Sequence, residues 1–130
     1  MFKSLYSLNC FYSKIEGLNN EALRDLSIKQ SDKKIDDSAS ATGYEDSPLD
    51  YDNVHVKLLR DTVKRTVHKH IDSRLVEGEI WAHVLKRGET TQIHSHRSKK
   101  DWDLLNVSWV YYPQIPEGEN LGGKIVFQTQ

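Results

Sequence analysis

The sequence predicts a single-domain α+β protein, and three observations lead to this fold class. A helical apolar stripe runs through residues 53–73, an alternating apolar pattern recurs through residues 78–130, and 130 residues suit one hydrophobic core. We therefore expect an N-terminal strand and helix (1–30), a loop (31–52), a second helix (53–73) and a C-terminal antiparallel sheet (78–130) with both helices packed outside it.

The first 30 residues are expected to form a strand and then a helix. The strand is indicated by apolar residues at every second position, which are Tyr6, Leu8, Cys10 and Tyr12. Cys10 is then a buried small residue rather than a nucleophile. Asn19 or Asn20 can cap the helix, which should end near Gln30.

Residues 31–52 are rich in Ser, Asp, Lys and Gly and carry few apolar anchors. Burial of the few apolar side chains in this segment would not offset the conformational entropy that the segment loses on ordering. A disordered linker is therefore the first interpretation. A functional lid is the alternative.

The segment 53–73 is the strongest helix in the sequence. Its apolar residues recur at steps of three and four, and they are Val56, Leu59, Val63, Val67 and Ile71. On this helix His68 and His70 point about 200° apart, so we expect surface histidines rather than a metal pair.

Alternation replaces the helical period after Gly78. It predicts four strands, at residues 80–85, 90–96, 104–112 and 124–129. A turn at Arg87, Gly88 and Glu89 separates the first two. His83 is expected to be a hydrogen-bonded histidine on a core-facing strand rather than a metal ligand.

His94 and His96 form the one local pattern with a specific chemical meaning. Side chains two apart on a strand project to the same face, so two imidazole nitrogens can reach one cation. A surface or hydrogen-bonded histidine pair is the alternative.

The spacing from Gly88 through His94 and His96 to Asp101 closely resembles the first metal motif of the cupins. More specifically, the run from Ile80 to Gln130 resembles the 2-oxoglutarate- and Fe(II)-dependent oxygenases common in bacteriophages and marine bacteria. The segments that carry this resemblance are "IWAHVLKRGETTQIHSH", "NVSWVYYPQIPEG" and "GGKIVFQTQ", in that order.

The resemblance implies a partial double-stranded β-helix, a jelly-roll-like antiparallel sheet, with Fe(II) and 2-oxoglutarate as cofactors. It implies that His94 and His96 bind the metal, with Asp101 or Asp103 supplying the carboxylate. Tyr111 and Tyr112 point in opposite directions, so one is expected to pack in the core while the other reaches the carboxylate of 2-oxoglutarate. No residue is assigned a further catalytic role.

The family's distal histidine and its 2-oxoglutarate-binding Arg or Lys lie beyond the position of Phe127. We therefore expect either a fragment or a chain that pairs with a second copy to complete the sheet. A non-catalytic cupin-like binding module and a structural phage protein are the alternatives.

Charge and localisation complete the expectations. The chain has 18 Lys and Arg against 19 Asp and Glu, a balance that indicates neither nucleic acid nor membrane as a partner of the whole protein. The substrate, a small molecule or a protein, is not specified, and any partner must be recognised locally. The resemblance implies the cytoplasm of a bacterial or phage-infected cell.

Overall fold

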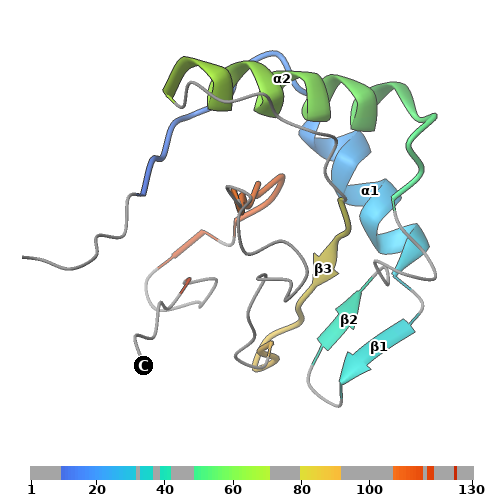
Figure 1. Ribbon diagram of the computed structural model, residues 1–130. Helices are drawn as coiled ribbons and strands as arrows, with labels where there is room; N and C mark the ends of the chain where they lie inside the picture. Colours follow the sequence, from blue (N-terminus) through green and yellow to red (C-terminus); the bar gives the residue numbers. More distant parts are fainter. Residues whose placement is uncertain are drawn as a thin grey trace, which may run out of the picture.

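Two helices and three short strands make up the regular structure (Figure 1). The computed structural model describes residues 10–31, 33–36, 39–41, 49–70, 80–91, 107–115, 117–118 and 125. In chain order the elements are α1 (Asn20–Gln30), β1 (Lys33–Asp36), β2 (Ala39–Ala41), α2 (Val54–His70) and β3 (His83–Val84).

Helix α1 begins and ends where its sequence provides hydrogen-bond partners for the helix termini. The Oδ1 of Asn19 accepts the backbone N–H of Ala22 at 3.0 Å, which satisfies one donor that the helix itself cannot pair. At the other end the N–H of Ser31 donates to the carbonyls of Ser27 and Ile28. The predicted helix, its Asn cap and its end near Gln30 are confirmed.

Helix α2 confirms the predicted helix over the part of that segment that the structure describes. The Oδ1 of Asn53 accepts the backbone N–H groups of His55, at 2.9 Å, and Val56, at 3.4 Å, and so caps the start of the helix. Val56 is fully buried, as the apolar stripe predicted. Residues 71–73, the predicted last turn, lie outside the described residues.

The three strands form one small antiparallel sheet in the order β1-β2-β3. Lys33 and Lys34 of β1 pair with Ala41 and Ser40 of β2, and a register shift follows between Lys34 and Asp36. On its other edge, β2 pairs with β3 through Ala41 and His83. Two of the strands come from the 31–52 segment, so the prediction of an unstructured loop there was wrong.

The predicted partial double-stranded β-helix is contradicted. In place of a jelly-roll sheet, the described residues contain two helices and three strands of two to four residues. The predicted strand 80–85 is reduced to His83–Val84, and residues 107–115 are not a strand. Alternation predicted strands because it assumed a continuous buried face, yet Leu85 and Val110 are 44% and 62% exposed.

The prediction that a second copy completes the sheet depended on the open edges of the β-helix. Because the β-helix is contradicted, this prediction no longer has a structural basis. The predicted strands at 90–96 and 124–129 fall almost entirely outside the described residues.

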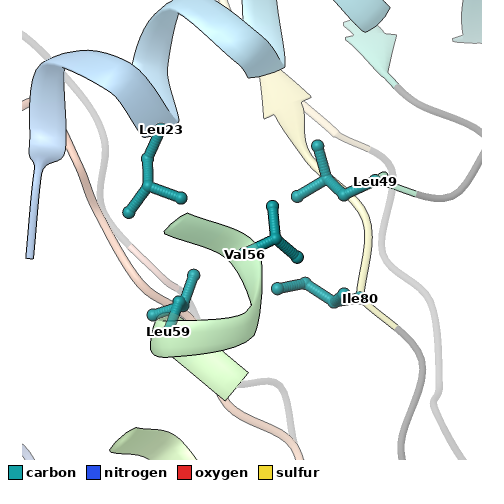
Figure 2. Close-up of a cluster of buried hydrophobic side chains, with 5 residues drawn as sticks. All are labelled: Leu23, Leu49, Val56, Leu59 and Ile80. Atoms are coloured by element: carbon teal, nitrogen blue, oxygen red, sulfur yellow. The ribbon is translucent and has the colours of Figure 1, made fainter. Parts of the chain in front are cut away.

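The core lies where α1 and α2 meet the chain around Leu49 and Ile80 (Figure 2). Five side chains that are at most 5% exposed make it up: Leu23, Leu49, Val56, Leu59 and Ile80. Val63, Trp109 and Tyr111 are among the half-buried residues that pack against this cluster. Residues from both helices and from two non-helical segments therefore share one core.

Tyr51 connects three parts of the chain at the edge of this core. Its hydroxyl accepts the backbone N–H of Ile80 at 3.0 Å, and its ring lies 4.4 Å from the guanidinium carbon of Arg60 in α2. Nearby, the N–H of Leu49 donates to the carbonyl of Ile80 at 3.3 Å. The chain that leads into β3 is thereby fixed against α2.

Candidate functional site

The predicted metal ligands His94, His96 and Asp101, together with Asp103, lie outside the described residues. Within the part of the chain that the structure describes, no group of three or more His, Cys, Asp or Glu side chains could hold a metal ion. The described segments nearest to the predicted site in the sequence are residues 80–91, which precede it, and residues 107–115, which follow it.

The turn that precedes the histidine pair has the predicted position. The N–H of Glu89 donates to the carbonyl of Lys86 at 3.0 Å, and the Oε2 of Glu89 accepts the N–H of Lys86 at 2.8 Å. Gly88 has a φ of 85°, a left-handed conformation that residues with a Cβ rarely adopt. The Arg87-Gly88-Glu89 turn is thus confirmed, and the described segment ends two residues after it, at Thr91.

Tyr111 and Tyr112, adjacent in the 107–115 segment, differ in exposure. Tyr111 packs against the core cluster, and its hydroxyl donates a short hydrogen bond to the Oδ1 of Asn20, the first residue of α1. Tyr112 is 39% exposed. Of the two phenols, Tyr112 is therefore the one that remains accessible to a co-substrate, while Tyr111 joins the 107–115 segment to α1.

Burial raises the pKa of Tyr111 and of Tyr112 above the usual 10.0 of the phenol. A raised pKa means that the folded chain favours the neutral phenol. The stabilisation is fully present below pH 10 and is lost as the pH rises through the raised pKa.

We therefore expect the free energy of unfolding to fall less steeply between about pH 9 and about pH 11 in the double variant Tyr111→Phe, Tyr112→Phe than in the wild type. Urea denaturation across that range, alongside titration of tyrosinate absorbance, measures the difference. Parallel loss of stability in the two proteins would exclude these phenols as its source.

His83 is hydrogen-bonded, as predicted, but it is exposed rather than core-facing. Its Nε2 accepts the indole Nε1–H of Trp81 at 2.8 Å, and the two rings meet edge to face with centroids 6.4 Å apart. This bond occupies the Nε2 lone pair that a metal would need.

Two predictions about the N-terminal part and the histidines of α2 are tested as well. Cys10 is exposed, so the prediction of a buried thiol was wrong. His68 and His70 are exposed, as predicted. The stack of the Phe11 ring on His70, with centroids 4.8 Å apart, was not predicted, because these residues are distant in the chain.

No helix in the described ranges is both long and apolar enough to span a bilayer. No family model, curated protein or solved structure matches this chain.

Proposed function

We propose that this chain is an Fe(II)- and 2-oxoglutarate-dependent oxygenase, or a part or remnant of one, that binds its metal through His94 and His96. The observation that carries the proposal is the His94-Ser95-His96 spacing, followed by the motif order from Ile80 to Gln130. The setting we propose is the cytoplasm of a bacterial or phage-infected cell.

The donor set fits this metal. Two imidazoles and one carboxylate are the ligands that non-haem Fe(II) oxygenases use, and Asp101 or Asp103 can supply the carboxylate. Two histidines on alternate residues can bind one ion from any extended segment, so the site does not require the β-helix that the structure contradicts.

Fe(II) with 2-oxoglutarate and O₂ supplies the oxidising chemistry that hydroxylates a C–H bond. The task of the chain is to hold and orient these groups. His94 and His96 would bind the metal as neutral imidazoles, and the accessible hydroxyl of Tyr112 would donate a hydrogen bond to a carboxylate of 2-oxoglutarate. Tyr111 would position that segment through its bond to Asn20.

A non-catalytic metal-binding module is the second candidate, and one observation favours it. The carboxylate of the usual His-x-Asp/Glu pair is replaced here by His96, which leaves Asp101 or Asp103, farther along the chain, to serve as the third ligand. Such a module would bind a divalent ion without any dependence on 2-oxoglutarate.

The experiment that separates these functions is an anaerobic titration of the full chain, purified without chelator. Fe(II) and 2-oxoglutarate added together are expected to produce a weak visible charge-transfer band that neither produces alone. Divalent-ion binding without this band would overturn the oxygenase in favour of the binding module. Absence of metal binding would overturn both and leave the structural phage protein.

A further inference from the structure

Helix α2 concentrates positive charge in a chain that is nearly neutral overall. Between Val54 and His70 it carries five Lys and Arg and one acidic residue, Asp61, whereas the whole chain has 18 basic and 19 acidic residues. We name four of these basic residues the α2 basic face: Lys57, Lys64, Arg65 and Lys69. The fifth, Arg60, is engaged by the ring of Tyr51.

Arg65 and Lys69 of the α2 basic face lie on the side of the helix away from the core, whereas Lys57 and Lys64 lie at its flank, 100° and 80° around the helix from Val56. At 100° per residue, Arg65 lies 180° around the helix from the buried Val56. Lys57, Arg65 and Lys69 are exposed. The contacts that hold two of them are weak: the Nζ of Lys57 is 3.6 Å from the carboxylate of Asp52, and Arg65 donates to the Oγ1 of Thr62 at 3.1 Å.

Exposed aromatic rings lie at the C-terminal end of this face. Phe11 is 61% exposed although it stacks on His70, and Tyr12, the next residue, is 99% exposed. Figure 1 shows residues 10–12, in blue, beside the His70 end of α2. Rings left open to water beside a basic surface are suited to stacking with nucleobases, since every base has a π-face.

We propose that the α2 basic face, together with Phe11 and Tyr12, binds single-stranded nucleic acid without sequence preference. The four cations would contact backbone phosphates along the helix, and the two aromatic rings would stack on unpaired bases at its end. The nearly neutral balance of the whole chain is compatible with this, because the field is local to one helix.

Two other anionic partners fit this surface less well. Insertion into a membrane needs an exposed apolar helix face, but Val56 and Leu59 of α2 are buried in the core, and between Val54 and His70 only Val54 and Leu58 are exposed large hydrophobics. A duplex would engage the cations but would keep its bases stacked away from Phe11 and Tyr12. Unpaired bases on a single strand use both parts of the site, which neither a membrane nor a duplex does.

Fluorescence anisotropy of the full chain with a labelled oligothymidylate of about 15 nucleotides tests the proposal. EDTA is included, so that the outcome does not depend on the proposed metal site. We expect binding that weakens about 50-fold between about 50 and about 200 mM salt, as four phosphate contacts to a single strand would give. Tyr12→Ala is expected to weaken binding at least about fivefold, which is the loss of one stacked base.

A matched pair of charge reversals supplies the control. Arg65→Glu with Lys69→Glu is expected to weaken binding at least about tenfold. Lys86→Glu with Arg87→Glu makes the same change of charge on the exposed turn beyond β3, which lies away from α2 in Figure 1, and should change affinity less than about twofold. Circular dichroism verifies that both variants keep their helices.

Equal effects of the two charge reversals would overturn the proposal, because they would indicate attraction to net charge alone. So would tighter binding to a duplex of the same length or to vesicles of phosphatidylcholine and phosphatidylserine. The proposal would also be overturned if the wild-type chain did not bind the oligothymidylate at low salt.

Discussion

Leu59→Ala is expected to lower the free energy of unfolding by about 2–5 kcal/mol. Leu59 is 4% exposed and belongs to a cluster of only five buried side chains (Figure 2). Truncation removes apolar area from water and leaves a cavity between α1 and α2 that the surrounding side chains fill incompletely. Such a loss is a large share of the stability of a small domain. Urea denaturation followed by circular dichroism measures it.

The neighbouring residue provides a matched control. Leu58 is 40% exposed and has the same chemistry and helix propensity, so Leu58→Ala should cost less than about 1 kcal/mol. Similar losses in the two variants would contradict the placement of Leu59 toward the core and Leu58 toward water.

His94→Ala and His96→Ala are each expected to weaken divalent-metal binding by more than about 100-fold. Loss of a residue that only supports a ligand already costs about 10- to 100-fold, so loss of a ligand should cost at least as much. Isothermal titration with Fe(II) under anaerobic conditions, or with a redox-inert divalent ion, measures this affinity. Asp101→Asn and Asp103→Asn, tested in the same way, identify the carboxylate, since only the ligand variant should lose affinity.

His68→Ala is the control for the metal prediction, because it removes an exposed imidazole from α2 and should leave metal affinity unchanged. If metal binding survives both His94→Ala and His96→Ala, the proposed site is wrong, whatever ion is used.

The helices were predictable because their signals are local. Val56 and Leu59 lie three residues apart, so they share a helix face wherever the helix packs. Asn19 caps α1 through a bond to a residue only three positions away. Neither inference required knowledge of the tertiary structure.

Strands β1 and β2 were not predictable, because the 31–52 segment lacks the alternating apolar pattern by which strands are recognised in a sequence. Strand β1 reads Lys-Lys-Ile-Asp, a charged segment without an apolar face, yet it pairs with β2. The apolar alternation that begins at Ile80 is present in the sequence, but other parts of the chain cover only some of its residues. Ile80 is buried, while Leu85 is 44% exposed. Composition alone does not say which neighbour will cover a strand.

Part of the candidate site could be predicted as well. That one of two adjacent tyrosines packs against the core while the other is more exposed is what the alternation of side chains in an extended segment predicts. The bond from Tyr111 to Asn20 could not be predicted, because it joins residues 91 positions apart. The same holds for the stack of Phe11 on His70, which depends on how the first described residues approach the end of α2.

The link from Leu49 and Tyr51 to Ile80 has a consequence for synthesis on the ribosome. Both helices are encoded before residue 71, and helices form within microseconds once their residues are free. Ile80, however, supplies both the last buried side chain among the described residues and the N–H that Tyr51 accepts. A nascent chain that has not yet emerged past residue 80 therefore exposes apolar side chains of both helical segments, because helices of this length are only marginally stable without tertiary packing. Chaperones that bind exposed apolar side chains can act during this interval.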